Sequence, residues 1–302
     1  MKQRNQGRLA AWLLLCANIA TAGHVNLQIL GSGGPELDGQ RAGSSYLIWV
    51  DDKARLLIDT GPGSQLRFAQ AKARFEDLDA VLFSHFHVDH SADLPSFIKA
   101  GYFTERQRDL PVYGPYGNHL MPDTEQFMAR LFGTSGAFAY LNDYLDGNSA
   151  SAYHLRPYTI DKAMTVTIAP DIRATAWPVH HGPIPALAWR LKIDDCTMTF
   201  TGDTSDREHT LAELAKDSDL LIAHHAIPEA ASGTARHLHM PPSVIGQIAA
   251  EAKVKHLLLS HLMRRSLRAK AESLPLILAH YQGPVTWADD TLLLPCQAAT
   301  PR

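Results

Sequence analysis

The segment His-Phe-His-Val-Asp-His at residues 85–90 constrains this chain more than any other feature. Three imidazoles and a carboxylate stand within six residues, directly after the apolar run at residues 80–83. If these side chains were buried together without a cation, they would be unpaired or would repel one another. The segment therefore predicts a metal site at the end of a buried strand, and a metal-dependent hydrolase is the first hypothesis.

The N-terminal residues have the order of a secretory signal peptide. Three basic residues precede an apolar stretch over residues 9–20, and small residues follow as far as Ala22. A membrane anchor is the alternative, but about 12 apolar residues are fewer than the roughly 20 that span a bilayer. We therefore expect residues 1–22 to be a signal peptide and residues 23–302 to form a single hydrolase domain. The mature chain is expected to be periplasmic or secreted, with no membrane contact.

Removal of the signal peptide makes the chain more acidic. The full chain has 28 basic and 31 acidic residues; without the three basic residues of the signal peptide, 25 remain against 31, a formal net charge of −6. A protein dedicated to nucleic acid is more often basic. We therefore expect a small-molecule ester substrate and no nucleic acid, and the sequence leaves a homodimer open.

The mature chain keeps two cysteines, Cys196 and Cys296. An exported protein can oxidise such a pair to a disulfide. A disulfide requires Cα atoms less than about 7 Å apart, and a sequence does not reveal that distance. Two free, buried thiols are therefore the expectation, and the disulfide is the alternative.

Residue patterns predict strands that alternate with amphipathic helices. The β-prone runs near the N-terminus cover residues 25–30, 45–50 and 55–58. The helical patterns cover residues 94–100, 210–216 with Asp206 or Ser205 as cap, 242–252, and 267–281 with Pro275 near the middle. Sheets with helices outside them make an α/β layered domain.

Four strand-like apolar runs end in a residue that can bind a metal. They are residues 80–83 before His85, 172–179 before His180 and His181, 198–201 before Asp203, and 256–260 before His261. Functional groups of layered α/β proteins gather at the carboxyl ends of strands, so these segments are expected to meet at one edge. Taken alone, each of the last three would be an ordinary histidine or turn, and the cluster at residues 85–90 is what favours the metal interpretation.

The number of candidate ligands favours two metal ions over one. Seven ligand side chains are more than one zinc requires. Two ions that share a carboxylate would use them all, and ions about 3.5–4 Å apart can hold both the attacking and the leaving oxygen of a displacement.

The motif at residues 85–90 resembles the signature of the metallo-β-lactamase superfamily. Residues 57–61, 202–204 and 260–261 are similar to other motifs of that family, and the likeness extends over residues 25–294. Residues 30–35, residues 41–45 and His239 before an amphipathic helix are most similar to its ribonuclease Z-like and arylsulfatase-like branch. The resemblance implies a four-layer αββα sandwich.

The resemblance also implies how the ligands divide between two zinc ions. The ligands of one zinc would be His85, His87 and His181. The ligands of the other would be Asp89, His90 and His261, with Asp203 as the bridge. His180 remains an alternative to His181, which is preferred because Gly182 follows it. Manganese or iron in place of zinc stays open.

The expected chemistry is hydrolysis. Two cations lower the pKa of a trapped water toward neutrality, and the resulting metal-bridging hydroxide attacks the substrate. Asp89 would also orient this hydroxide. His239 resembles the histidine that gives a proton to the leaving group in phosphodiesterase members of the family. As the alternative, residues 236–239 would be an exposed loop without a catalytic role.

The leading prediction is an exported di-zinc hydrolase of a phosphodiester or sulfate ester. Processing of tRNA is disfavoured by the signal peptide, the acidic mature chain and the lack of an obvious long basic arm. One alternative is a β-lactam or lactone hydrolase on the same site, which would not need His239. Another is a non-enzymatic metal-binding protein. Substrate choice is expected to lie in residues 101–159, whose aromatic residues form either a substrate wall or an ordinary surface loop.

Overall fold

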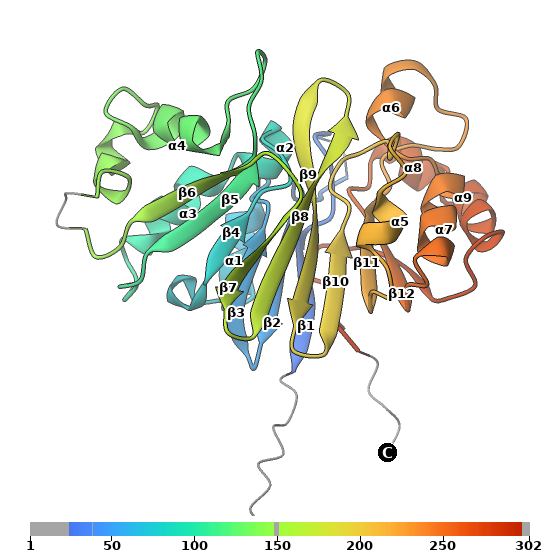
Figure 1. Ribbon diagram of the computed structural model, residues 1–302, viewed down its shortest axis with the longest axis horizontal. Helices are drawn as coiled ribbons and strands as arrows, with labels where there is room; N and C mark the ends of the chain where they lie inside the picture. The colour runs from blue at the N-terminus through green and yellow to red at the C-terminus, as the bar shows by residue number, and fades with distance from the viewer. Residues whose placement is uncertain (1–23, 38, 148–150, 298–302) are drawn as a thin grey trace, which may run out of the picture.

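The computed structural model describes residues 24–37, 39–147 and 151–297. Within these ranges, two seven-stranded sheets lie face to face with helices on their outer sides (Figure 1). The predicted four-layer αββα sandwich is therefore confirmed. The predicted signal peptide at residues 1–22 lies outside the described residues and stays a prediction.

The first sheet has the strand order β14-β1-β2-β3-β4-β5-β6. Its strands β14 to β3 pair antiparallel, and its strands β3 to β6 pair parallel. The strands are β1 (Val25–Gly31), β2 (Ser45–Val50), β3 (Lys53–Ile58), β4 (Ala80–Leu82), β5 (Leu110–Pro115), β6 (Leu155–Ile160) and β14 (Leu293–Pro295). The three N-terminal strands agree with the sequence prediction to within two residues at each end.

The second sheet has the strand order β13-β12-β11-β10-β9-β8-β7. Here the strands from β7 to β10 pair antiparallel, and those from β10 to β13 pair parallel. The strands are β7 (Met164–Ala169), β8 (Ile172–His181), β9 (Ile184–Ile193), β10 (Cys196–Phe200), β11 (Leu220–His224), β12 (His256–Ser260) and β13 (Val285–Trp287). Both sheets thus combine an antiparallel half with a parallel half.

Burial on both faces explains the apolar composition of the central strands. In β2, Tyr46 and Ile48 point into the core between the sheets, whereas Leu47 points into the core beneath the helices. A strand that is covered on both faces reads as a continuous apolar run. Trp189 is a fully buried member of the core between the sheets, and its indole N–H donates to the Phe83 carbonyl oxygen at 3.0 Å.

Helices cover the outer face of each sheet with their apolar sides (Figure 1). Those on the first sheet are α1 (Ser64–Gln70), α3 (Leu94–Gly101) and α4 (Thr124–Phe132). Those on the second sheet are α5 (Leu211–Leu214), α7 (Pro242–Glu251) and α9 (Lys270–Leu278). The short helices of the connecting loops are η1 (Phe75–Asp77), α2 (Val88–Ser91), η2 (Ala139–Tyr144), α6 (Gly233–Leu238) and α8 (Arg264–Arg268). Among the helices that the structure describes, none has the length and apolar character to cross a membrane.

Two of the predicted helices are corrected by the structure. The continuous helix predicted over residues 267–281 is wrong, because the chain divides at Ala269, which ends α8 and whose carbonyl oxygen accepts the N–H of Ser273 at 2.8 Å to begin α9. The helix predicted over residues 210–216 is shorter and covers only α5. Its N-cap residue is Thr210 and not the predicted Asp206 or Ser205, although the Asp206 carboxylate accepts the N–H groups of Thr210 and Leu211 at 3.1 and 3.2 Å.

The two cysteines form a disulfide, so the expectation of two free thiols is wrong. Cys196 and Cys296 are bonded with their Cα atoms 6.0 Å apart. Cys296 reaches this position because it follows β14, and its N–H donates to the Val25 carbonyl oxygen at 2.9 Å. The pairing of β14 with β1, at opposite ends of the chain, is a contact that residue patterns did not reveal.

We predict that replacing both cysteines with serine lowers the free energy of unfolding by about 2–4 kcal/mol, because the disulfide closes a loop of 100 residues in the unfolded chain. Urea unfolding of the oxidised protein and of the double variant measures the difference. A reducing agent should lower the stability of the unmodified protein to that of the variant and leave the variant unchanged. Equal unfolding midpoints for all four samples would contradict the prediction.

Candidate metal centre

The candidate site lies where the carboxyl ends of six strands meet. β3, β4, β8, β10, β11 and β12 all run toward the same edge of the sandwich. The segments that follow them therefore converge, as the sequence predicted. Nearly all the side chains brought together there are buried, and His87 is half-buried beside the exposed Val88. The site is therefore reached from solvent on the side of His87 and Val88.

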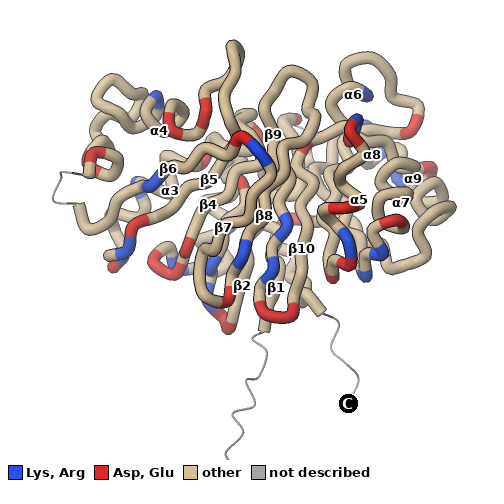
Figure 2. Tube along the Cα trace, in the orientation of Figure 1, with Lys and Arg blue, Asp and Glu red and all other residues tan. Residues whose placement is uncertain are grey.

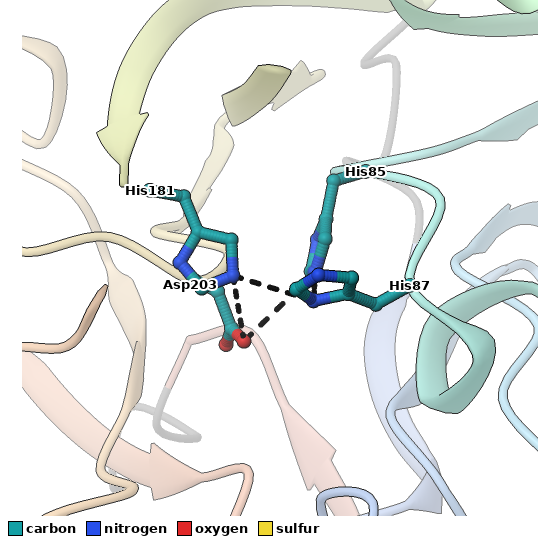
Figure 3. A group of neighbouring side chains, drawn as sticks. All are labelled: His85, His87, His181 and Asp203. Atoms are coloured by element: carbon teal, nitrogen blue, oxygen red, sulfur yellow. Dashed lines mark hydrogen bonds and ion pairs between the residues drawn. The ribbon is translucent and has the colours of Figure 1, made fainter. Parts of the chain in front are cut away.

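The first group of side chains consists of His85, His87, His181 and Asp203 (Figure 3). The Nδ1 atom of His87 lies 3.0 Å from Nε2 of His85 and 3.4 Å from Nε2 of His181. The Oδ2 atom of Asp203 lies 3.7 Å from Nε2 of His181 and 3.9 Å from Nε2 of His85. Three imidazole nitrogens and one carboxylate oxygen thus face a common point.

The second group consists of Asp89, His90 and His261, again with Asp203. The Oδ2 atom of Asp89 lies 3.1 Å from Nε2 of His261 and 3.5 Å from Nε2 of His90. The Oδ2 atom of Asp203 lies 3.4 Å from Nε2 of His261 and 3.8 Å from Nε2 of His90. The same carboxylate oxygen therefore belongs to both groups, which is the position required of a bridging ligand.

Asp203 is held as a carboxylate by the imidazoles around it. Burial alone would raise its pKa, but His261, His239 and the hydrogen bond from His224 hold that pKa well below its usual range. The Oδ1 atom of Asp203 lies 2.7 Å from Nδ1 of His224. One oxygen is thus occupied by His224, and the other remains for the two ligand groups.

Three of the five candidate ligand histidines are oriented by a hydrogen bond to the remaining ring nitrogen. Nδ1 of His181 bonds to the Leu238 carbonyl oxygen at 3.0 Å, Nδ1 of His90 lies 2.8 Å from Oδ2 of Asp59, and Nδ1 of His85 lies 3.0 Å from Oγ of Ser84. Histidines that bind metals in proteins usually have such a partner, which fixes the tautomer and leaves the other nitrogen for the metal. These contacts support a metal-binding arrangement.

The structure separates the two neighbouring histidines on β8. His181 points into the first group, whereas Nδ1 of His180 bonds to Oγ of Ser205 at 2.8 Å and its ring contacts His237 outside the group. Of the predicted residues, His239 also reaches the site: its Nδ1 atom lies 3.9 Å from Oδ2 of Asp203. Every predicted ligand is therefore brought together, and their roles as ligands stay a prediction.

His224 belongs to the site and was missed by the sequence analysis. It follows the apolar run at residues 220–223, so the pattern that pointed to His85, Asp203 and His261 applies to it as well. The next residue, His225, was missed too. It is fully buried against Trp287, and neither ring nitrogen has a hydrogen-bond partner among the described residues. Burial lowers the pKa of His225 to about 4, so its ring is neutral.

The donor atoms fit divalent metal ions. Nε2 of His90 is buried without a hydrogen-bond partner in the described ranges of the chain, although it faces two carboxylates. Imidazole nitrogens and carboxylate oxygens are the ligands that zinc accepts, and one ion in each group would satisfy the atoms that face each other there. The first group would hold one ion and the second group the other.

The two groups differ in the charge that they carry before a metal binds. Burial lowers the pKa of His85, His87 and His181, the last to about 4. Burial also disfavours a charged His90, yet Asp89 and Asp59 raise its pKa to about 9. Asp203 and Asp89 likewise raise the pKa of His261. At neutral pH the histidines of the first group are therefore neutral and can accept a cation, whereas His90 of the second group holds a proton where the cation would lie.

Comparisons with known proteins agree with this geometry. The profile of a family described as "Beta-lactamase superfamily domain" matches residues 54–262. Ribonuclease Z of Methanosarcina mazei is 24% identical over 267 residues, which are 78% of this chain and 87% of that protein. Ribonuclease Z of Mycobacterium bovis is 27% identical over 207 residues, which are 66% of this chain and 69% of that protein.

Solved structures share the fold. The metallo-beta-lactamase fold protein YhfI from Bacillus subtilis superposes with a TM-score of 0.72 at 24% identity and covers 90% of this chain and 99% of its own. The short form of human tRNase Z superposes with a TM-score of 0.67 at 17% identity and covers 90% of this chain and all of its own. At these identities the superpositions show the fold alone.

The expectation that this chain does not use nucleic acid is corrected by these relatives. The relatives matched in sequence are named ribonuclease Z, and that name points to a nucleic-acid substrate. The expectation rested on net charge, which averages over the whole surface and says little about the few side chains around the reacting bond.

We predict that metal binding at pH 7.5 releases about one proton per chain from His90, because that ring must lose its proton before it can bind an ion, and His261, whose pKa is also raised, adds to the release. Calorimetric titration of the metal-free protein with Zn²⁺ in buffers of different ionisation enthalpy measures this number. The release should fall as the pH is raised past about 9, where His90 is already neutral. Binding without proton release at pH 7.5 would contradict the prediction.

Proposed function

This chain belongs to the metallo-β-lactamase superfamily, in its ribonuclease Z-like branch, and we propose that it is an exported, zinc-dependent phosphodiesterase that cleaves a nucleic-acid substrate. The observation that carries the proposal is the position of His239 beside the two ligand groups. A phosphodiester leaves as an alkoxide, which needs a proton, and His239 is placed to supply one.

His239 combines burial with a free ring nitrogen. It is 7% exposed, and its Nδ1 atom has no hydrogen-bond partner in the part of the chain that the structure describes. Its ring centroid lies 5.5 Å from that of His181 and 5.7 Å from that of His261, so it borders both groups. α6 ends at Leu238 directly before it, and the Leu238 carbonyl oxygen orients His181. The same turn of chain therefore positions a ligand and the proton donor.

The protonation of His239 would respond to the substrate. Burial lowers its pKa to about 3, and the neighbouring imidazoles and Arg265 contribute to this. A phosphodiester anion next to the ring adds negative charge and favours the protonated form. His239 would thus acquire its proton when the substrate binds and give it to the leaving oxygen as the bond breaks.

The bound ions would supply a reactive water near neutral pH and balance the charge on the phosphate. The Asp89 carboxylate lies in the second group and would orient that water by accepting a hydrogen bond from it. Its pKa is lowered to about 2, because His90 and His261 outweigh the effect of burial, so it accepts hydrogen bonds throughout the neutral range.

Surface charge favours a short substrate over a long duplex. Basic and acidic residues are interspersed along the described trace (Figure 2). Several cations are already paired with carboxylates: Arg41 with Asp289, Arg55 and Arg108 with Asp79, Arg67 with Asp290, Arg156 with Asp109, and Lys255 with Asp219. Paired cations bind phosphates weakly, because the carboxylate must first be displaced. We therefore propose short oligonucleotides as the substrate.

The test is to measure how fast the zinc-loaded mature protein hydrolyses four substrates: short oligoribonucleotides, an aryl phosphodiester, an aryl sulfate and a β-lactam. The proposal expects cleavage of the oligonucleotides and the phosphodiester. Exclusive cleavage of the sulfate or of the β-lactam would replace the proposal with the corresponding alternative.

The His239→Ala variant sharpens this test. It should lose about 10²–10⁴-fold in rate on oligonucleotides, because a ribose alkoxide needs the proton. It should lose much less on a p-nitrophenyl phosphodiester, whose leaving group is stable as an anion. The matched control is His237→Ala, two residues away on α6, which is exposed and contacts His180. Equal losses on both substrates would contradict the role of His239 as proton donor.

Export is proposed from the N-terminal segment and is supported by the disulfide. Disulfides persist in oxidising compartments and are rare in the cytosol. The chain recovered from a periplasmic or secreted fraction is expected to begin at Gly23, which mass spectrometry of the intact protein would measure. As the control, a chain without residues 1–22 should remain in the cytosol with reduced cysteines. An intact N-terminus in the exported fraction would contradict cleavage after Ala22.

A further inference from the structure

Tyr46 is linked to the bridging carboxylate through one side chain. Its hydroxyl oxygen lies 2.9 Å from Nε2 of His224, and Nδ1 of His224 lies 2.7 Å from Oδ1 of Asp203. The hydroxyl also lies 3.0 Å from Oγ of Ser260, next to His261. All four of these linked side chains are at most 2% exposed. The chain of contacts therefore runs through the interior, out of reach of solvent.

The contacts fix which nitrogen of His224 carries the proton. An ionised carboxylate can only accept, so Nδ1 of His224 must donate to Asp203. In the neutral ring Nε2 is then left as an acceptor, and the Tyr46 hydroxyl, whose one proton also faces Oγ of Ser260, is the donor beside it. Without that hydroxyl, Nε2 would be a buried acceptor with no partner. The ring would then be held on its Nδ1 side alone, by Asp203.

The contacts from Tyr46 through His224 to Asp203 join the two sheets at the edge where the two ligand groups lie. Tyr46 is on β2 of the first sheet and His224 ends β11 of the second. The Tyr46 ring packs against Phe200 with the ring centroids 5.4 Å apart, which places the hydroxyl at the top of the core between the sheets. The mechanism proposed above uses neither Tyr46 nor His224.

We propose that Tyr46 is a positioning residue for the metal centre: by bonding to Nε2 of His224, it holds that ring in the orientation in which Nδ1 engages Oδ1 of Asp203, so that Oδ2 stays turned toward both ligand groups. The inference rests on the proposed metal site and adds to it a tyrosine outside the ligand set. Partners of this kind typically change metal affinity about 10- to 100-fold when they are removed.

The test is the affinity of the Tyr46→Phe variant for Zn²⁺, measured by competition with a chromogenic chelator in the absence of substrate. The substitution removes only the hydroxyl and keeps the ring against Phe200. We expect the affinity for at least one Zn²⁺ to fall about 10- to 100-fold. A changed absorption spectrum of the Co²⁺-loaded variant should accompany the loss.

The matched control is Tyr281→Phe, which removes another buried hydroxyl that donates to the Val254 carbonyl oxygen at 3.2 Å, in the core beneath the helices. It should bind Zn²⁺ as the unmodified protein does. In a His224→Leu background, Tyr46→Phe should cause no further loss, because the residue through which it acts is gone.

The outcomes separate this inference from the proposed function. Equal affinity of Tyr46→Phe and the unmodified protein, or a full additional loss in the His224→Leu background, would overturn the inference and leave the proposed function standing. If the unmodified protein binds no Zn²⁺, both are overturned. Loss of catalysis with unchanged Zn²⁺ affinity would also overturn the inference.

Discussion

The arrangement of side chains in the candidate site depends on one carboxylate oxygen, Oδ2 of Asp203. This oxygen lies within 4 Å of nitrogens from five imidazoles. Such a cluster is unfavourable in a protein interior unless positive charge is present at its centre. The fold supplies the rigidity that keeps these groups together, because the ligands follow buried strands of two packed sheets. The candidate metal centre therefore depends on the sandwich, because the two sheets bring the candidate ligands to one edge, where a bound cation would stabilise them.

Sequence patterns were sufficient where the informative residues are close together or end a strand. The cluster at residues 85–90 was recognised from spacing alone, and Asp203 and His261 from the apolar runs before them. His224 ends a strand in the same way and was overlooked, because the run at residues 220–223 was not read as a strand. His181 was preferred to His180 because Gly182 follows it, which resembles the family pattern. The structure adds the reason, since β8 turns alternate side chains to opposite sides.

Other features depend on contacts between distant parts of the chain, which local patterns do not encode. The disulfide forms because β14 pairs with β1, more than 250 residues away. The link from Tyr46 to His224 forms because two sheets meet. The break at Ala269 was hidden by apolar spacing that continues from α8 into α9. Net charge misled for a related reason: it sums residues that the fold pairs with one another, such as Arg55 with Asp79.

The pairing of β1 with β14 has a consequence for how the chain can be rearranged. Asn26 lies opposite Pro295, so the two ends of the described fold are neighbours at the edge away from the metal centre (Figure 1). The site therefore does not depend on where in this edge the chain begins and ends. A circular permutant that joins these ends with a short linker and opens a surface loop would keep every ligand in place. The neighbouring ends also allow this domain to be inserted into a loop of another protein with its catalytic edge facing outward.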